Sequence, residues 1–596
     1  MCRIAGIINP SLTVSETEQI TEEMCTLQKH GGPDDGGVFT MAEHHLALGN
    51  RRLSLLDLSA SGHQPMHYGD RYTVTYNGEL YNFKTLKEEL QAAGMHFNNN
   101  TDTEVILAAF AAWNTESFSR LNGMFAFALW DNTEKALYLV RDAAGIKPLY
   151  WSTHTGGIVF ASEIRAFAPV PYLQQTNDDA EIFQLAYGYI PEPVTTLAHV
   201  KPLPKGCYLK YDTKTSDCSL VSFSFFSYSS TIRDGEEARK ITRDATSDAV
   251  KRQMVADAQV GVFLSGGIDS AIIAKLAGSG RDHIHTLSIW FGEEKYSEKK
   301  YQDLLAKKLN SRHHSILVEE KDFHRHFPEI LRAMDMPSCD GINTWFISKY
   351  AAEAGLKAVL SGIGADELFG GYPSFRRMQA ASMLQRLPKL SFQLAEKAGS
   401  KKLNRLSYLR MDGIRGLYLF LRGHFTPAQI AAQTGAYESQ VWQVLNDVPA
   451  SPALAGLGAG NTAGWMEFNL YMQDQLLRDA DVMSMAHGLE IRVPFLDNEV
   501  INAVFSISEK IKFRGAYPKE LLVSAFKKML PEEIWQRPKM GFSFPFAEWL
   551  RNSEYVRDLE GSANRHTRKA CRDFMQGRLH WSRIMSLIVL KYKGFS

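Results

Sequence analysis

Short apolar runs separated by turn residues dominate the first 212 residues of the chain. Runs of this length predict β-strands, and glycines and Asn-Gly pairs such as Asn77-Gly78 predict the turns between them. The expected strands lie at 4–8, 45–48, 72–76, 124–130, 136–141 and 157–161, with helices around 83–93 and 103–113. This pattern predicts packed sheets with helices outside, an α+β layered domain.

The pattern changes at residue 213, where a serine-rich stretch without helical periodicity begins and continues to residue 235. We interpret 213–235 as a linker, and its phenylalanines predict that it packs against a surface. Beyond it, a helix is expected over 236–257, and the apolar runs are at 260–264, 284–291 and 356–360. Their alternation with helical segments predicts a parallel α/β sheet.

From about residue 375 to the end, apolar residues recur at helical spacing, with a glycine- and alanine-rich break at 453–464. A chain of 596 residues exceeds the size at which one hydrophobic core keeps growing. The sequence therefore predicts one domain at 1–212 and a second, with a helical C-terminal part, at 236–596.

Charge, cysteine spacing and the length of apolar runs limit the classes of protein to which this chain can belong. Lysine plus arginine number 66, and aspartate plus glutamate also number 66, so the net charge gives no reason to expect nucleic acid or an anionic membrane as partner. The six cysteines are far apart, without the spacing of a zinc site or a dense disulfide framework. No apolar run approaches the ~20 residues of a membrane span. These features predict a soluble protein of a reducing cytoplasm.

Cys2 directly follows the initiator methionine, so removal of Met1 would leave a thiol and a free α-amine on one residue. An α-amine titrates at about 7.7–8.0, close enough to neutrality to take the thiol proton as the sulfur attacks a carbonyl. An isolated cysteine is more often a small buried hydrophobe. The interpretation of Cys2 as a nucleophile therefore depends on the rest of the chain.

Residues 264–270, Leu264-Ser265-Gly266-Gly267-Ile268-Asp269-Ser270, join an expected strand to an expected helix. Two glycines allow an anion to approach the backbone, the helix N-terminus supplies N–H groups, and the serines add hydroxyl donors. A simple glycine turn with a serine cap would explain only one serine and one glycine. The loop lacks the P-loop lysine and resembles the pyrophosphate-binding loop of adenylating ATP-pyrophosphatases, which implies that Asp269 holds magnesium.

A second glycine-rich cluster at 361–372 follows another expected strand and contains Asp366. Two carboxylates, Asp269 and Asp366, together with phosphate oxygens suit Mg²⁺. An exposed acidic pair beside a glycine turn is the alternative interpretation.

With these features in one chain, the sequence resembles the glutamine-hydrolysing asparagine synthetases and their amidotransferase relatives over most of its length. The N-terminal motifs of this resemblance are MCRIAG at 1–6, RLSLLD at 52–57, GHQPM at 62–66, YNGELYN at 76–82, TDTE at 101–104, and RD at 141–142 with GIKPLY at 145–150. The C-terminal motifs are LLRDAD at 476–481, MAHG at 485–488, EIRVPFLD at 490–497 and RPKMGF at 537–542. The resemblance implies an N-terminal-nucleophile glutaminase of αββα architecture, followed by an ATP-pyrophosphatase-type domain.

By this resemblance, Cys2 attacks the side-chain amide of glutamine, and the Asn77 side chain and the Gly78 N–H form an oxyanion hole. The implied glutamine site comprises Arg52, Leu53, Ser54, Leu55, Leu56, Asn77, Gly78, Glu79 and Asp102. Arg52 would bind the glutamine carboxylate by its planar fork. Glu79 and Asp102 would receive its ammonium. Taken alone, Asn77-Gly78 more often forms a hairpin turn, and an arginine is usually a surface charge.

On the ATP side, the resemblance implies adenosine contacts from Leu264, Ile289, Ser361 and Gly362. Lys519 and Lys539 match lysines that contact phosphates or stabilise the charged intermediate; a helical lysine is otherwise a solvated residue. The implied ligands are glutamine, ATP, Mg²⁺ and a carboxylate such as aspartate. The resemblance also allows a homodimer. Because ammonia in water is mostly protonated, the family passes it through an internal passage between domains.

Two positions depart from the family pattern. Asparagine synthetases commonly carry an acidic residue after the Ser-Gly pair at 361–362, where this chain has Ile363, which cannot accept a proton or bind a cation. Aspartate is therefore open to question as the acceptor, and another acid, such as a sugar acid or biosynthetic intermediate, is the alternative. Gly31 replaces the usual arginine of a His-Arg-Gly-Pro-Asp motif. This change is expected to loosen packing at the glutamine site.

The leading hypothesis is an amidotransferase that adenylates a carboxylate with ATP and amidates it with ammonia from glutamine, with aspartate as the first-choice acceptor. An intramolecular amide ligase of the β-lactam synthetase type would have no reason to keep Cys2, Arg52, Asn77-Gly78 and Asp102. A storage or regulatory protein on the same scaffold would be expected to lose both sets of site residues. Neither loss is seen in the sequence.

Overall fold

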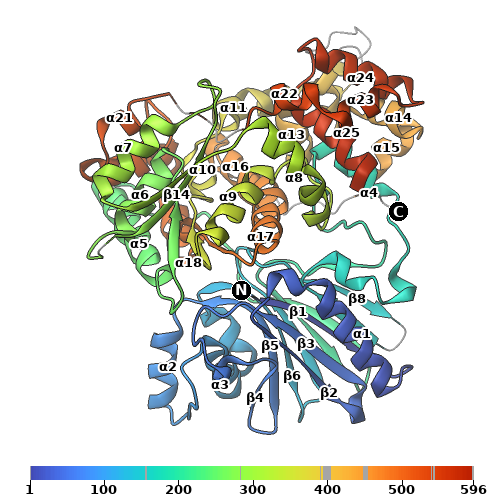
Figure 1. Ribbon diagram of the computed structural model, residues 1–596, viewed down its shortest axis with the longest axis vertical. Helices are drawn as coiled ribbons and strands as arrows, with labels where there is room; N and C mark the ends of the chain where they lie inside the picture. Colours follow the sequence, from blue (N-terminus) through green and yellow to red (C-terminus); the bar gives the residue numbers. More distant parts are fainter. Residues whose placement is uncertain are drawn as a thin grey trace.

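The computed structural model describes the chain except residues 1, 155–156, 282, 390, 393–403, 448–453, 455, 514, 539, 541–543 and 594–596. Within the described residues, an N-terminal and a C-terminal part lie one above the other, and the N-terminus of the chain lies at their boundary (Figure 1).

Two antiparallel six-stranded sheets form the N-terminal part, with strand orders β10-β8-β9-β1-β3-β2 and β12-β11-β7-β6-β5-β4. The strands of the first sheet are β1 (Cys2–Ile8), β2 (Asp35–Met41), β3 (Leu46–Arg52), β8 (Tyr150–His154), β9 (Gly157–Ala161) and β10 (Lys201–Pro202). Those of the second are β4 (Met66–Tyr68), β5 (Tyr72–Leu80), β6 (Gly123–Asp131), β7 (Ala136–Arg141), β11 (Cys207–Asp212) and β12 (Cys218–Ser222).

The sheets and their helices form four layers. Helix α1 (Val14–Leu27) packs on the first sheet, and α2 (Phe83–Ala92) and α3 (Asp102–Trp113) belong to the layer beside the second. Strand β1 shows the alternation that this arrangement requires: Ile4 and Ile8 face the core between the sheets, whereas Ala5 and Ile7 face the core under α1. The predicted α+β sandwich of αββα architecture is confirmed.

The Asn77-Gly78 pair lies inside strand β5, so the turn expected there is wrong. The two residues pair with Ala126 and Phe125 of β6. A Cβ at position 78 would lie 2.2 Å from the carbonyl oxygen of Met124, so the close strand packing requires the glycine.

The segment expected as a linker is partly an edge strand, because β12 extends the second sheet by pairing with β11. After β12 the chain runs along the C-terminal part, where the ring of Tyr228 stacks on Phe505 with centroids 4.0 Å apart and Phe226 contacts Phe468. The expected packing of this aromatic segment against a surface is confirmed.

A five-stranded parallel sheet of order β15-β14-β13-β16-β17 lies in the C-terminal part, as predicted. Its strands are β13 (Val260–Phe263), β14 (His285–Trp290), β15 (Arg312–Leu317), β16 (Ala358–Leu360) and β17 (Glu490–Arg492). The helices associated with it are α5 (Gly235–Gln253), α6 (Ile268–Ala277), α7 (Lys299–Leu309), α8 (Glu320–Ala333), α9 (Ile342–Glu353), α10 (Ala365–Phe369), α17 (Arg478–Met485), α18 (Asn498–Ser506) and α20 (Glu520–Phe526).

Further helices complete this part of the chain: α11 (Pro373–Gln385), α13 (Gly413–Arg422), α14 (Pro427–Thr434), α15 (Glu438–Asn446), α16 (Ala459–Met466), α19 (Glu509–Phe513), α21 (Glu532–Trp535), α22 (Phe546–Trp549), α23 (Glu554–Glu560), α24 (Arg565–Met575) and α25 (Trp581–Lys593). A π-helical segment, Glu467–Leu477, connects α16 to α17. Helix α16 covers 459–464 of the expected break, so that expectation is wrong there. Residues 454 and 456–458 are outside any helix, as expected, and residues 453 and 455 lie outside the described residues.

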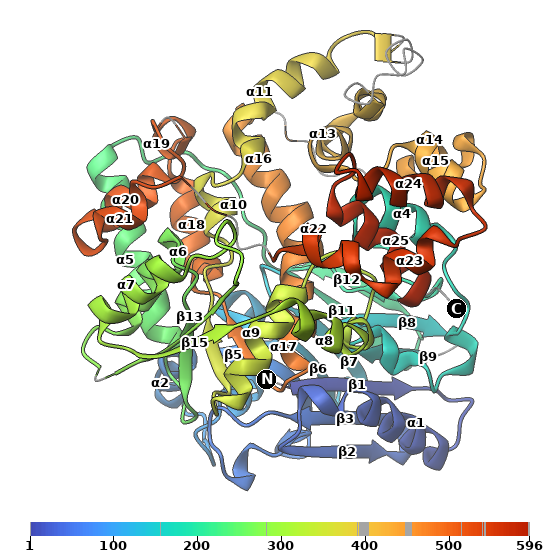
Figure 2. The ribbon, with the colours of Figure 1, turned by 45° about the horizontal axis from the view of Figure 1, so that its top comes forward.

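Helix α4 (Asp179–Tyr187) comes from the N-terminal stretch of sequence but packs among the C-terminal helices (Figure 2). Its residues Phe183 and Leu185 join the same hydrophobic core as Leu419, Leu445 and Ile588. Burial of this apolar surface stabilises the association of the N-terminal and C-terminal parts.

None of the helices in the described part of the chain combines the length and the apolar character needed to cross a bilayer. All six cysteines lie within that part, and all are free thiols.

Candidate active sites

Cys2 begins strand β1, and its side chain lines a cavity that we call the Cys2 cavity. The cavity is lined by Cys2, Arg52, Leu53, Leu55, Leu56, Gly62, Gln64, Tyr76, Gly78, Glu79, Thr101, Asp102 and Thr103. The structure thus brings together most of the residues that the sequence analysis assigned to a glutamine site. Ser54 lies beside this lining and donates its backbone N–H to Asp34 Oδ2 at 2.8 Å. Burial raises the pKa of the Cys2 thiol, and the charge of Arg52 opposes that rise.

The Arg52 guanidinium is held in place by the loop that follows it. Its Nη1 donates to the carbonyl oxygen of Ser59 at 3.0 Å, and its Nη2 donates to those of Leu56 at 3.2 Å and Asp57 at 2.5 Å. A Cβ at Gly62 would lie 1.9 Å from Nη2 of Arg52, so only glycine leaves room for the fork. This positive group is therefore fixed at the cavity wall.

Two buried carboxylates occupy the same cavity. Asp102, the first residue of α3, accepts hydrogen bonds from the Tyr76 hydroxyl and the Leu80 N–H, both at 2.9 Å. Glu79 Oε2 lies 3.2 Å from Nη2 of Arg492, which belongs to the C-terminal part. Burial raises the pKa of both Asp102 and Glu79. A cavity with one fixed cation and two carboxylates matches the charges of a free α-amino acid.

Asn77 lies directly behind Cys2. Its Oδ1 accepts a hydrogen bond from the Cys2 backbone N–H at 3.2 Å. Its Nδ2 is buried and has no hydrogen-bond acceptor among the described residues. A buried donor without an acceptor is costly, so this N–H₂ group is available to a further acceptor. Asn77 itself is fully buried and is not among the residues that line the cavity, whereas its neighbour Gly78 is.

Sequence reasoning missed five lining residues: Gly62, Gln64, Tyr76, Thr101 and Thr103. Gln64 Oε1 accepts hydrogen bonds from the Tyr76 N–H at 2.7 Å and from Asn50 Nδ2 at 3.2 Å. All of these residues lie within motifs of the resemblance: GHQPM at 62–66, YNGELYN at 76–82 and TDTE at 101–104. Only membership in those motifs could have indicated them, because their residue types carry no special signal.

Gly31, which is expected to loosen packing at the glutamine site, lies against the side chain of Arg3. A Cβ at Gly31 would lie 2.7 Å from Cγ of Arg3. The Arg3 guanidinium is fully buried, with Nε 2.6 Å from Glu163 Oε1 and Nη1 2.8 Å from Asp481 Oδ2. The Arg3 side chain thus occupies space that a side chain at position 31 would enter.

The phosphate loop, residues 264–270, connects β13 to α6. Gly266 has a φ of +80°, a conformation that favours glycine. Ser265 Oγ accepts the Gly267 N–H at 3.3 Å and lies 3.1 Å from Ser270 Oγ. These bonds shape a tight turn at the N-terminus of α6, where free N–H groups and the helix dipole favour an anion.

Lys519 lies between the two carboxylates that were predicted to hold magnesium. Its Nζ is 2.5 Å from Asp269 Oδ2 and also pairs with Asp366. Burial lowers the pKa of Lys519, but the two carboxylates outweigh it and raise that pKa above its ordinary value. The two acidic side chains therefore converge on a cation.

This donor set fits magnesium. The described residues contain no group of three or more histidine, cysteine or acidic side chains that could enclose a metal. Magnesium is commonly bound by only one or two carboxylates, with phosphate oxygens and water completing its shell. Asp269 and Asp366 would supply the two carboxylates.

The phosphate loop and the 361–372 cluster meet at one edge of the parallel sheet. They follow the adjacent strands β13 and β16, and the chain leaves β13 toward β14 on its other side. Ligands of open α/β sheets bind in such a crevice, outside the carboxyl ends of the strands where the strand order reverses. A Cβ at Gly362 would lie 2.9 Å from Asp269 Cβ, which shows how closely the two loops approach.

The other predicted ATP residues have different placements. Leu264 is fully buried, Ile289 on β14 is 1% exposed, and the Ser361 N–H donates to the Arg492 carbonyl at 2.8 Å. Ile363 is partly buried against the hydrophobic core of this part. Lys539 lies outside the described residues.

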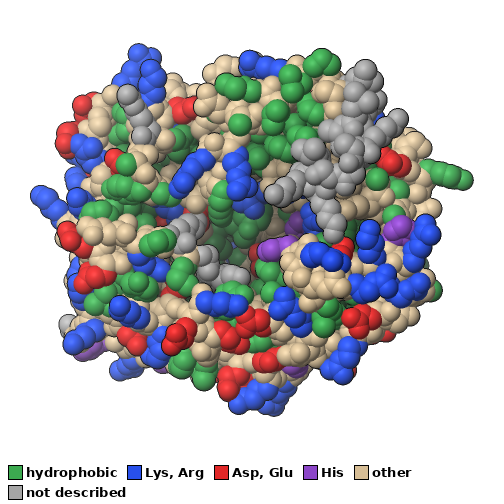
Figure 3. Space-filling view, turned by 90° about the horizontal axis from the view of Figure 1, so that it is seen from above, with side chains coloured by type: hydrophobic (Ala, Val, Ile, Leu, Met, Phe, Trp, Pro, Cys, Tyr) green, Lys and Arg blue, Asp and Glu red, His purple; other side chains and the backbone are tan. Residues whose placement is uncertain are grey.

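Seen from above, the C-terminal part is hollowed near its centre, with hydrophobic side chains on the floor and lysine or arginine side chains at the margin (Figure 3).

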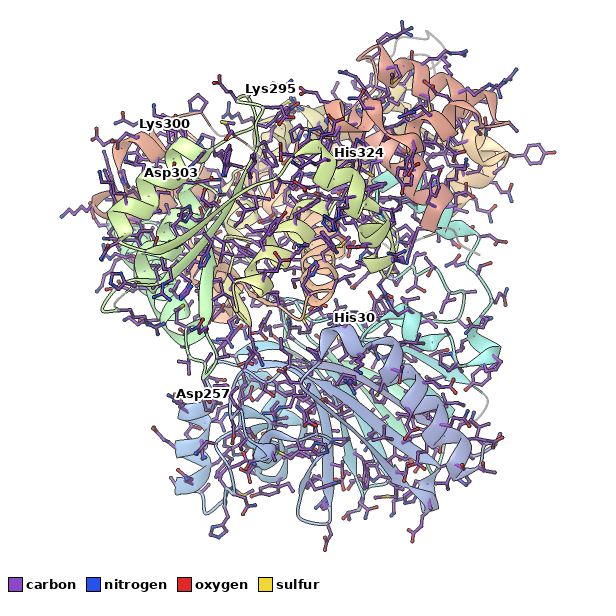
Figure 4. All side chains as sticks on the ribbon, in the orientation of Figure 1. His30, Asp257, Lys295, Lys300, Asp303 and His324 are labelled. Carbon is purple, nitrogen blue, oxygen red and sulfur yellow. The ribbon has the colours of Figure 1, made fainter. Side chains whose placement is uncertain are left out.

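Polar contacts join the N-terminal and C-terminal parts of the chain across their boundary, beside the Cys2 cavity. The Leu55 carbonyl accepts the Asp257 N–H at 2.9 Å, and Lys357 Nζ lies 2.6 Å from Asp34 Oδ2. His30 and Asp257 both lie near this boundary, whereas Lys295, Lys300 and Asp303 lie toward the far side of the C-terminal part (Figure 4). Leu55, which lines the Cys2 cavity, therefore contacts the C-terminal part of the chain directly.

Comparison with known proteins agrees with this arrangement. Residues 1–221 match the glutamine amidotransferase domain model, and residues 242–580 match the asparagine synthase model. The chain is 32% identical to glutamine-hydrolysing asparagine synthetase 1 of Bacillus subtilis over 94% of this chain and 90% of that protein. It is 33% identical to a putative glutamine-hydrolysing asparagine synthetase of Mycobacterium tuberculosis over 89% and 84%.

A third relative carries a different name. The amidase chry2 of Gibberella zeae is 26% identical over 92% of this chain and 90% of its own length. The family models and the first two relatives together cover nearly the whole chain. The protein belongs to the asparagine synthase family and is a glutamine-dependent amidotransferase of that type.

Proposed function

We propose that the protein converts a carboxylate into an amide, using the amide nitrogen of glutamine and the energy of ATP, and releases glutamate, AMP and pyrophosphate. The observation that carries this proposal is the Cys2 cavity, in which a thiol, a fixed guanidinium and two carboxylates surround one space. The phosphate loop and its two acidic neighbours, on the same chain, supply the second half of the reaction. We assign the first half to 1–212 and the second to 236–596, joined by 213–235.

In the first half-reaction, Cys2 is the nucleophile. After removal of Met1 its α-amine accepts the thiol proton, and the sulfur forms a thioester as ammonia leaves. Asn77 Nδ2 and the Gly78 N–H would hold the developing oxyanion, and one such donor is worth about 3–4 kcal/mol. The unpaired, buried Nδ2 of Asn77 supports this role.

The remaining cavity residues would hold the glutamine. Arg52 would bind its α-carboxylate, and Glu79 with Asp102 would bind its ammonium. Leu53, Leu55 and Leu56 would enclose the aliphatic stem. Water then hydrolyses the thioester to release glutamate and regenerate the thiol.

In the second half-reaction, the acceptor carboxylate attacks the α-phosphate of ATP, and pyrophosphate leaves. Ser265, Gly267 and Ser270 would bind the departing phosphates through hydroxyl and backbone N–H groups. Lys519, and Lys539 by resemblance, would offset their charge. Magnesium held by Asp269 and Asp366 would supply charge neutralisation for the phosphates when bound. Ammonia from the first half-reaction then displaces AMP from the acyl-adenylate.

Aspartate is the first acceptor that we propose, since relatives of similar length are named asparagine synthetases. Ile363 favours testing a second acceptor class, because it supplies no carboxylate where the family commonly has one. The second candidate is therefore another carboxylic acid, such as a sugar acid or a biosynthetic intermediate.

We also propose that the enzyme is cytoplasmic, consistent with its six free thiols, and that it forms a homodimer.

The test is pyrophosphate release from ATP with ammonia over a panel of carboxylates. We expect one class of acid to give pyrophosphate and AMP in equal amounts, together with an amide. Activity with aspartate would support asparagine synthesis, and activity with a different acid alone would replace aspartate. Failure of every acid, in a protein that binds ATP, would contradict the ligase reaction.

A further inference from the structure

Arg492 is a buried arginine that the proposed mechanism does not use. It is the last residue of β17 and is fully buried. Its Nε lies 2.6 Å from Glu490 Oε1, and its Nη2 lies 3.2 Å from Glu79 Oε2. Its Nη1 donates to the carbonyl oxygens of Gln253 and Val255, each at 2.7 Å. The guanidinium is therefore held by several contacts in a defined position.

The same residue touches both candidate sites. Through its side chain it reaches Glu79, which lines the Cys2 cavity. Through its main chain it accepts the Ser361 N–H at 2.8 Å, in the loop that faces Asp269. Strand pairing places Arg492 directly beside Leu360, so a shift of the Arg492 backbone would displace the loop that follows Leu360. No other contact described above joins the two sites through one residue.

The charges around Arg492 indicate how a ligand on Glu79 would affect it. Glu79 and Glu490 both pair with Arg492, and the charge of Lys147 also acts on Glu490. Burial raises the pKa of Glu79, and Arg492 opposes that rise. A ligand ammonium on Glu79 would add a further positive charge to the group and compete with Arg492 for Glu79. Arg492 would then bind more strongly to Glu490 and to the two backbone carbonyls. These contacts would restrain β17, which lies beside the Ser361 loop.

We propose that Arg492 is a positioning residue that couples occupancy of the glutamine site to occupancy of the ATP site. The inference rests on the proposed function, since it takes glutamine as the ligand of the Cys2 cavity and ATP as the ligand of the phosphate loop. Coupling between sites is reciprocal, so each ligand should tighten binding of the other by the same factor. We expect a factor of about 5 or more.

The experiment uses the full chain with Cys2→Ala, which binds glutamine without hydrolysing it. Calorimetry measures the Kd of glutamine with and without saturating magnesium and α,β-methylene-ATP, an analogue that cannot transfer AMP. The reverse titration, of the analogue with and without glutamine, checks reciprocity. The ratio of the two Kd values is the coupling factor.

Arg492→Met is then added to Cys2→Ala. The matched control is Arg252→Met, because Arg252 also pairs with two carboxylates, Asp497 at 2.9 Å and Glu499 at 2.8 Å, and lines neither site. Should Arg492→Met fail to fold by circular dichroism, Arg492→Met/Glu490→Gln removes one of the stranded charges, and Arg492→Lys keeps the charge while losing the fork.

We expect the coupling factor to fall to about 1 in the Arg492 variants and to persist in Arg252→Met. A factor that persists without Arg492, that is already 1 in the parent protein, or that is lost equally in Arg252→Met would overturn the inference. In each of these cases both ligands still bind, and the proposed function stands. A parent protein that binds neither glutamine nor the analogue would instead overturn the proposed function, and this inference with it.

Discussion

Lys519 Nζ lies 2.5 Å from Asp269 Oδ2, so a lysine ammonium occupies the gap in which the proposed reaction needs a metal. The same ammonium pairs with Asp366. In the ligand-free protein it compensates two carboxylates that would otherwise repel each other. Binding of a metal–nucleotide complex must therefore compete with this ammonium or shift it toward the phosphates.

Replacement of Lys519 by methionine should expose this competition. We expect Lys519→Met to bind Mn²⁺ at least about tenfold more tightly in the absence of nucleotide, since removal of a cation worth about 1.4 kcal/mol changes an equilibrium constant tenfold. Electron paramagnetic resonance of free Mn²⁺ measures this directly. Lys527→Met is the control, because Lys527 lies over the Trp535 ring, away from both carboxylates. Equal Mn²⁺ affinity in Lys519→Met and the parent would contradict the account.

Cys2→Ala should separate the two half-reactions. We expect glutamine-dependent amide formation to fall by at least about 10³-fold, because the covalent step is lost, whereas ammonia-dependent formation should stay within about twofold. Amide product is measured with each nitrogen source at saturating ATP. Loss of both activities in a folded protein would argue against separate sites.

Asp479 should make stability depend on pH in a defined direction. Its carboxyl is buried and accepts a hydrogen bond from the Ser338 hydroxyl at 2.6 Å, and burial raises its pKa from 3.8 to about 7. The folded chain therefore keeps a proton that the unfolded chain loses, and the fold is destabilised as pH rises from about 4 to 7.

Asp479→Asn removes this ionisation. We expect a higher Tm than the parent at pH 8, reflecting a gain in the free energy of unfolding on the order of 4 kcal/mol, with the gain shrinking toward pH 4. Calorimetric scans from pH 4 to 8 measure it. A gain independent of pH would mean that something other than ionisation of Asp479 is responsible.

Gly31 and Arg3 should behave as an exchangeable pair. Gly31→Arg alone forces a side chain against Arg3 and should cost about 1–3 kcal/mol of stability together with glutaminase activity. Arg3→Gly/Gly31→Arg restores one arginine and one glycine in the same space, so it should recover part of both losses. Thermal unfolding and glutamate release measure the effect, and strictly additive losses would show that the two positions do not share space.

Much of the fold could be predicted because local pattern determines it. The predicted strands at 136–141 and 157–161 match β7 and β9 residue for residue, and the turn glycines of the phosphate loop lie where expected. The pattern failed at Asn77-Gly78, where close packing on β6 overrides the turn preference of the pair. It failed again at β12, because an edge strand with both faces exposed carries no alternation of polar and apolar residues.

The site shows the same division. Motif residues such as Cys2, Arg52 and Asp102 could be assigned from sequence, and the structure places them in one cavity. The contacts of Arg492 with Glu79, and of Arg3 with Asp481, could not be. Each joins residues more than 400 positions apart in the sequence, and only the docking of the two parts brings them together.

The nature of the nucleotide product tests the central claim most directly. The protein is supplied with ATP, the active acceptor acid and glutamine labelled with ¹⁵N at its side-chain amide, and the products are resolved by chromatography and mass spectrometry. The account predicts AMP, pyrophosphate, glutamate and a ¹⁵N-labelled amide in equal amounts. Formation of ADP and phosphate, or of an amide without the label, would contradict it.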